Sequence, residues 1–160
     1  MWQRIQTLYY GLSAIILGTL LFGIELFGFR GESFYYRVSA YGIEKLEINA
    51  NKSIGDVTEL WAVPFYFVVI SLILLVLMTA LSFKNLNRQF KLARALFFVY
   101  LLLVVSVVIF AVVGVQTDEE VKRELGLGFF LFVVGFPFTF LGQIGVKRDK
   151  ALIDSLNRLR

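Results

Sequence analysis

Residues 84–94 read Lys-Asn-Leu-Asn-Arg-Gln-Phe-Lys-Leu-Ala-Arg and carry four basic side chains and no acidic one. This basic stretch separates two uncharged apolar runs, Leu60–Phe83 and Ala95–Gln116. At 1.5 Å per residue, each run forms about 33–36 Å of helix, enough to cross a hydrocarbon core of about 30 Å. Short loops rich in Lys and Arg stay on the cytoplasmic side of a membrane. The stretch therefore predicts two membrane-spanning helices joined by a cytoplasmic loop.

The composition also indicates a membrane protein. The chain has 160 residues, of which 58% are hydrophobic and 18% charged, against about 45–50% and 25% in soluble domains. This length allows one four-helix unit and no separate soluble domain. The sequence contains no cysteine and no histidine, which excludes disulfides, thiolate nucleophiles and imidazole chemistry. We expect no cofactor, no metal site and no catalytic residue.

Two further apolar runs lie near the ends of the chain. The first, residues 5–24, exceeds the 7–15 residues usual for a signal peptide and ends without a small-residue cleavage site, so we expect it to be retained as a span. The sequence thus predicts a single transmembrane domain, residues 1–160, with an outer loop at 30–59 and a cytoplasmic tail at 147–160. The four expected spans cover about residues 5–24, 60–83, 95–116 and 125–146.

The outer loop has the pattern of a small β-structure. Ser33–Ala40 is rich in strand-forming residues, and residues 45–49 alternate charged with apolar side chains, with Tyr41-Gly42 between the two segments. This pattern favours a β-hairpin, with an irregular loop as the alternative. The expected fold class is an all-α membrane protein, a four-helix transmembrane bundle with a small β-hairpin-like extracytoplasmic loop.

The charges separate according to this topology. The predicted inner segments hold ten basic and two acidic residues, and the outer segments hold six basic and ten acidic ones. All four spans therefore agree on one orientation, with both termini in the cytoplasm. Because the excess positive charge follows topology, we expect the lipid bilayer and no nucleic acid as a partner.

Small residues recur in the first and fourth spans, where they permit close approach of two helices. We predict that these two spans pack on each other; the alternative is that the small residues form a docking surface for another protein. The predicted helix-packing residues are Gly11, Ala14, Gly18, Gly128, Gly135 and Gly142.

Two other residues near or within the spans allow a functional and a structural interpretation. Glu25 follows the first span and could belong to an ion or proton site, but its position favours a carboxylate at the membrane surface. Pro137 lies within the fourth span and could break a transport helix, but no charged residue accompanies it, which favours a simple kink.

Two groups of residues are candidates for contacts outside the bundle. Tyr35, Tyr36 and Tyr41 could bind a partner protein, or could cover the outer ends of the spans. The tail places Leu152, Ile153, Leu156 and Leu159 on one face of an amphipathic helix. We predict that a cytoplasmic patch, in which Arg4 pairs with Asp149 or Asp154, fixes this helix; the alternative is a tail lying loosely on anionic lipid. The patch comprises Gln3, Arg4, Gln6, Asp149, Asp154, Arg158 and Arg160.

The two ends of the chain have distinctive residues: Met1, Gln3–Tyr9, Asp149, Lys150, Leu152, Ile153, Ser155 and Arg158–Arg160. In these residues the chain resembles a family of small four-span proteins of the bacterial inner (cytoplasmic) membrane, of unknown function and from Bacteroidota. The resemblance implies the architecture and the membrane, and no activity or catalytic residues. Asn157 departs from the family pattern, in which an Asp is expected. In layout the chain also resembles claudin-like tetraspans.

These observations lead to a hypothesis about function. We expect a non-catalytic accessory or assembly subunit that binds another membrane protein. The alternative is a small carrier or channel for a neutral or lipid-like molecule. An enzyme is disfavoured, because the hydroxyls in the spans have no base to activate them.

Overall fold

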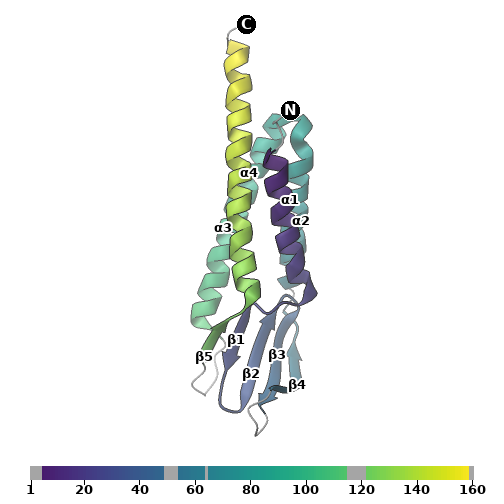
Figure 1. Cartoon of the computed structure of the whole chain (residues 1–160), viewed down its shortest axis with the longest axis vertical. Helices are drawn as coiled ribbons and strands as arrows, with labels where there is room; N and C mark the ends of the chain where they lie inside the picture. Colours follow the sequence, from purple (N-terminus) through teal and green to yellow (C-terminus); the bar gives the residue numbers. More distant parts are fainter. Residues whose placement is uncertain (1–4, 49–53, 64, 115–121, 159–160) are drawn as a thin grey trace.

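The structure is a computed structural model that describes residues 5–48, 54–63, 65–114 and 122–158. In this part of the chain, four long helices lie side by side and one sheet covers one end of them (Figure 1). The helices are α1 (Ile5–Thr19, continued by the 3-10 turn η1, Leu20–Phe22), α2 (Phe65–Leu81, continued by η2, Ser82–Lys84), α3 (Leu86–Val113) and α4 (Leu127–Arg158). The strands are β1 (Phe27–Arg30), β2 (Phe34–Ser39), β3 (Gly42–Ile48), β4 (Ile54–Trp61) and β5 (Lys122–Leu125).

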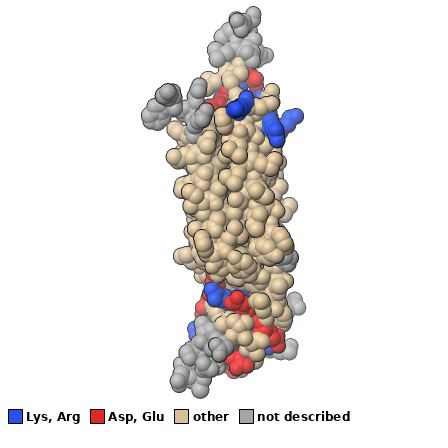
Figure 2. All heavy atoms as spheres, turned by 90° about the vertical axis from the view of Figure 1, so that its right-hand side faces the viewer, with Lys and Arg blue, Asp and Glu red and all other residues tan. Residues whose placement is uncertain are grey.

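All four helices are long and apolar enough to cross a membrane, which confirms the predicted four spans. Charged side chains gather at the two ends of the molecule and leave an uncharged band between them (Figure 2). The chain is therefore a multi-pass membrane protein. We call the end that carries the strands the sheet end, and the opposite end, where α2 joins α3, the basic end.

The sheet has five antiparallel strands in the order β4-β3-β2-β1-β5. The predicted hairpin is confirmed: β2 pairs with β3 from Ser39↔Gly42 outward, although Asn49 lies outside the described residues. Gly42 has a φ of 151°, and a side chain there would collide with the Trp61 carbonyl oxygen, so the turn requires glycine. The sheet is larger than a hairpin because β1, β4 and β5 extend it.

Strand β5 comes from the connection between α3 and α4, far along the chain from the other four strands. It pairs with β1 in the register Phe27↔Leu125 to Arg30↔Lys122. The sheet therefore ties the α1–α2 connection to the α3–α4 connection. At the other edge, β4 pairs with β3 through two register shifts, and such irregularities twist an edge strand away from further pairing.

The helix limits differ most from the expected spans at the start of the second and third helices and at the end of the fourth. The basic stretch is mostly helical, because the Asn85 side chain accepts a hydrogen bond from the Arg88 N–H at 3.2 Å and so caps the start of α3. The second helix begins at Phe65, because Leu60 and Trp61 complete β4. The fourth helix runs through Pro137 to Arg158, so the tail continues α4 instead of forming a separate helix.

Aromatic side chains join the sheet to the helices. Phe27 of β1 lies with its ring centroid 5.9 Å from that of Phe110 on α3 and 5.5 Å from that of Phe129 on α4. Phe29 meets Phe110 edge-on at 6.4 Å. These contacts make one apolar core that runs from the bundle into the sheet.

Candidate functional site

The interface between α1 and α4 is closely packed around glycines of α4. A Cβ on Gly142 would lie 2.7 Å from the Tyr10 Cζ atom, so the tyrosine ring occupies the space that a side chain would need. One turn further on, the Ser13 hydroxyl donates to the Gly135 carbonyl oxygen at 3.1 Å. Gly135 also lies against the Tyr100 hydroxyl, which donates to Phe132 O at 2.8 Å. Large side chains from α1 and α3 thus enter gaps that the glycines leave on α4.

The small residues of α1 do not form the other half of this interface. A Cβ on Gly11 or Gly18 would meet no atom within 4 Å, so both lie on the outward side of α1, while Ala14 packs against the core. This corrects the prediction for Gly11 and Gly18: α4 receives the Tyr10 ring, not a second glycine face. Gly128 lies at the sheet end, where its N–H donates to the Glu25 carbonyl oxygen at 2.8 Å.

The α2–α3 side of the bundle lacks comparable contacts. Each described serine hydroxyl of these two helices donates to a carbonyl of its own helix: Ser71 to Phe67 O at 2.7 Å and Ser106 to Leu102 O at 2.9 Å. Toward the sheet end, a cavity of about 230 Å³ lies between the start of α2, the C-terminal part of α3 and the sheet. Its walls include Phe27, Val38, Phe65, Leu103, Val107 and Phe110.

The interior near the basic end holds polar atoms that have no protein hydrogen-bond partner. Gln89 of α3 is fully buried and neither its Oε1 nor its Nε2 atom is paired. The Tyr10 hydroxyl and the Oε1 atoms of Gln6 and Gln143 are also shielded and unpaired. Buried groups of this kind are satisfied by water in most proteins, so this end of the bundle is the more polar one.

The three tyrosines of the predicted partner surface have different environments. Tyr35 is buried, and its hydroxyl donates to the Glu25 carboxylate. Burial, and then this hydrogen bond, raise the pKa of the Tyr35 phenol above its usual value. Tyr36 is buried against the ring of Trp61, with centroids 6.4 Å apart. Tyr41 is half-exposed and donates to Leu21 O at 2.5 Å. All three therefore make contacts within the chain, and two of them are closed to a partner.

The predicted patch at the basic end is described in part. The Gln6 Nε2 atom donates to the Asp149 carboxylate at 2.9 Å, so the start of α1 does meet the beginning of the tail. Asp154 is exposed, and the helical residue Arg158 has no described side chain. Nearby, the Lys150 Nζ atom lies 4.8 Å above the ring of Phe90. Gln3, Arg4 and Arg160 lie outside the described residues.

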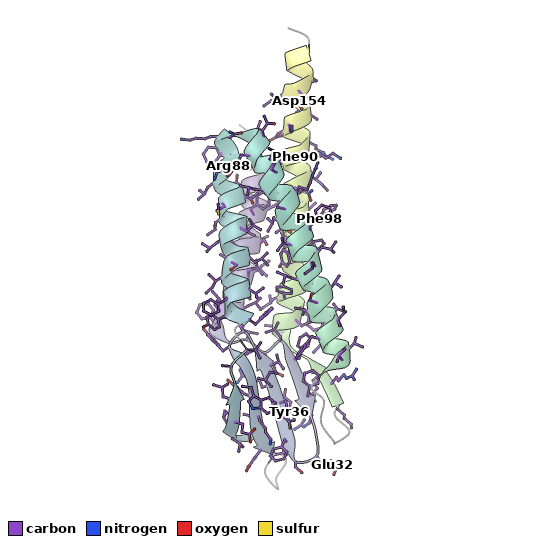
Figure 3. All side chains as sticks on the ribbon, turned by 180° about the vertical axis from the view of Figure 1, so that it is seen from behind. Glu32, Tyr36, Arg88, Phe90, Phe98 and Asp154 are labelled. Atoms are coloured by element: carbon purple, nitrogen blue, oxygen red, sulfur yellow. The ribbon has the colours of Figure 1, made fainter. Side chains whose placement is uncertain are left out.

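Beyond Asp149, α4 rises past the α2–α3 connection, and we call Asp149–Arg158 the extension of α4 (Figure 3). Its apolar side chains Leu152 and Ile153 are 63% and 43% exposed. Within the described residues, no group of three or more acidic side chains is placed to hold a metal ion. Sequence reasoning missed the α2–α3 cavity, because its walls come from five separate segments.

Four apolar helices and a five-stranded sheet built from two connections define a four-span membrane protein with a sheet at one end. The chain belongs to a family described as a domain of unknown function, DUF4293, whose model matches residues 2–159. None of the curated proteins matches the chain.

Proposed function

We propose that the chain is a non-catalytic accessory or assembly subunit, which binds the cytoplasmic part of another membrane protein through the extension of α4. The supporting observation is the pair of exposed apolar side chains, Leu152 and Ile153, on a helix that continues past the rest of the bundle. In the sequence, Leu156 and Leu159 follow at the same spacing, and their side chains lie outside the described part of the structure. An apolar face of this spacing is what a helix presents to a groove of a partner.

The length of α4 indicates that the apolar face of its extension lies outside the membrane, in water. The helix has 32 residues, about 48 Å at 1.5 Å per residue, whereas the hydrocarbon core is about 30 Å thick. The ten-residue extension accounts for about 15 Å of the excess. Because the extension continues a membrane-spanning helix, it would need a sharp bend to lie flat on lipid, which disfavours the loose tail.

The orientation is part of the proposal. Basic residues of the α2–α3 connection and of α4 lie at the basic end, and positive charge of this kind remains in the cytoplasm. The extension, the start of α1 and the α2–α3 connection are then cytoplasmic, and the sheet lies on the other side of a bacterial inner membrane. The partner is expected to present a cytoplasmic helix or groove.

Substitutions on the two sides of the extension test this proposal. The double variant Leu152→Glu, Ile153→Glu should abolish recovery of a stoichiometric partner after purification in mild detergent, because two charges replace the apolar face. The matched control, Ala151→Glu, places one charge on the opposite side and should retain the partner. Purification of the unmodified chain as a lone monodisperse bundle, or equal recovery by both variants, would contradict the proposal.

The alternative function, a carrier or channel for a neutral or lipid-like molecule, is favoured by a different observation, the apolar cavity between α2, α3 and the sheet. A cavity whose walls all lie toward the sheet end supports binding more than passage through the bundle. Recovery of a lone bundle in the experiment above would leave this alternative as the better account.

A further inference from the structure

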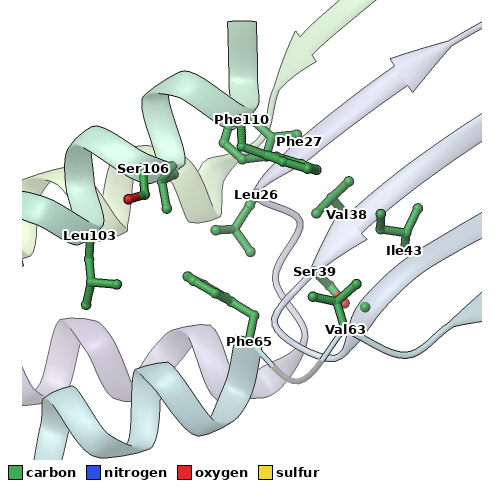
Figure 4. A pocket seen from close by; sticks show the side chains of 12 residues that line it. Leu26, Phe27, Val38, Ser39, Ile43, Val63, Phe65, Leu103, Ser106 and Phe110 are labelled. Carbon is green, nitrogen blue, oxygen red and sulfur yellow. The ribbon is translucent and has the colours of Figure 1, made fainter. Parts of the chain in front are cut away.

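We infer that the cavity between α2, α3 and the sheet binds the hydrocarbon chain of one lipid, which enters sideways from the membrane leaflet at the sheet end. This site is separate from the extension of α4 and does not depend on a protein partner. Figure 4 shows the cavity with apolar side chains from three directions around it. Leu103, Val107 and Phe110 come from α3, Phe27 and Val38 from the sheet, and Phe65 from the start of α2.

The chemistry of the walls excludes water as the main occupant. The cavity lining has two hydroxyl-bearing residues, Ser39 and Ser106. The Ser106 hydroxyl already donates to Leu102 O, and the Ser39 oxygen accepts from the Tyr41 N–H at 3.3 Å. A water molecule needs two to four polar partners to be stable in a cavity. An apolar occupant fits the walls, and a space of 230 Å³ is too large to remain empty without cost.

The cavity is continuous with the surface that faces lipid. A second groove between α2 and α3 shares Leu103 with the cavity and continues along Phe67, Ser71 and Leu75 of α2, opposite Val99 of α3. Ser106 and Val63, at the margin of the cavity, are exposed on the same uncharged part of the molecule. A lipid chain can therefore reach the cavity without leaving the hydrocarbon layer.

The length of cavity and groove together selects the kind of occupant. From Phe65 to Leu75, α2 rises about 15 Å, which is half of a hydrocarbon core of about 30 Å. One extended acyl chain of a single leaflet has this length. In Figure 3, α2 and α3 meet at the basic end and separate toward the sheet, the end at which the cavity lies. Packing, not the hydrophobic effect, must drive the binding, because lipid tails are already in an apolar medium.

The test uses the full chain in vesicles of phosphatidylethanolamine and phosphatidylglycerol, with a small fraction of phosphatidylethanolamine carrying a diazirine on one acyl chain. After illumination, the labelled residues of α3 are identified by mass spectrometry. We expect several-fold more label on Leu103 and Val107, which face the cavity, than on Leu102 and Val105, which face the surrounding lipid at the same depth. Equal labelling on both sides of α3 would show ordinary surrounding lipid and overturn the inference.

Two substitutions separate the cavity from the rest of the surface. Leu103→Trp should fill the cavity and remove the excess label, whereas Val105→Trp, two residues away on the outward side, should leave it unchanged. Thermal unfolding in detergent checks that both variants fold. Should Leu103→Trp fail to fold, Ser106→Phe at the cavity margin serves in its place. Crosslinks to a protein instead of lipid at Leu103, or excess label that persists in a folded Leu103→Trp or Ser106→Phe protein, would overturn the inference.

Discussion

The two sides of the bundle differ in how their helices are held together. On one side, α1 packs on α4 with glycines under large side chains, and Ser13 and Gln6 donate hydrogen bonds from α1 to α4. On the other side, the serine hydroxyls of α2 and α3, those of Ser71 and Ser106, bond within their own helix, and a cavity separates the two helices toward the sheet. In a bilayer, apolar surface alone does not bring helices together. Close packing and hydrogen bonds therefore decide which pairs of helices pack tightly against each other.

The largest expected effect comes from adding one methyl group to α4. Gly142→Ala should lower the free energy of unfolding by about 1–3 kcal/mol, because the new Cβ would lie 2.7 Å from the Tyr10 ring. Gly11→Ala, in open space on α1, should instead raise it by up to about 1 kcal/mol through helix propensity. Unfolding in mild detergent measures both. If both substitutions changed the free energy of unfolding in the same direction, Gly142 would not be tightly packed and Gly11 would not be in open space as described.

A smaller effect should follow from the loss of one interhelical hydrogen bond. Ser13→Ala leaves the Gly135 carbonyl oxygen without its donor and should cost about 0.6 kcal/mol, with an upper limit of about 1.7. Ser71→Ala is the matched control, because its hydroxyl bonds only within α2. The same unfolding measurement should leave this control near the parent value. A larger loss for Ser71→Ala than for Ser13→Ala would reverse the comparison between the two sides.

The smallest effect concerns the sheet end of the α1–α4 side, where Glu25 accepts hydrogen bonds from Tyr35 and Gly128. The pKa of the Tyr35 phenol is raised by burial and then by Glu25. A phenol with a raised pKa contributes stability below its unfolded pKa of about 10 and loses it as the pH rises further. We expect the thermal midpoint to fall above that pH, and Tyr35→Phe to reduce the fall. An equal fall in Tyr35→Phe would show that another group titrates.

The spans could be predicted because they depend on local composition. Each expected span is a run without charged residues, and a charge within the membrane would be costly whichever helix the span packs against. The β2–β3 hairpin was predictable for the same reason, since its strands and turn are adjacent in sequence. Strand β5 was not, because Lys122–Leu125 is short, charged and exposed, and only its partner β1 makes it a strand. The start of α3 was missed because its basic residues suggested a loop, although they favour a helix equally well.

The packing of the candidate sites could be predicted only in part. Gly135 and Gly142 were identified from their spacing, but the spacing does not say whether a glycine receives another glycine or a tyrosine ring. Tyr35 and Tyr36 are neighbours in β2 and point to opposite faces of the sheet. Both are buried because separate groups cover them, the Glu25 carboxylate over Tyr35 and the Trp61 ring over Tyr36, and the spacing of the tyrosines does not reveal these partners. The extension of α4 was predicted as an amphipathic helix, while its continuity with the fourth span depends on the helix persisting through Lys147–Asp149.

The position of β5 has a consequence for biosynthesis. Strands β1–β4 are translated before α2, whereas β5 follows α3, so β1 has one unpaired edge until three helices have been made. An open strand edge can pair with other chains. A ribosome-bound chain that ends before Lys122 would expose this edge of β1 at the sheet end, where the α1–α2 and α3–α4 connections both lie. Completion of the sheet is therefore a late event in translation, because β5 can pair with β1 only after both α2 and α3 have been made.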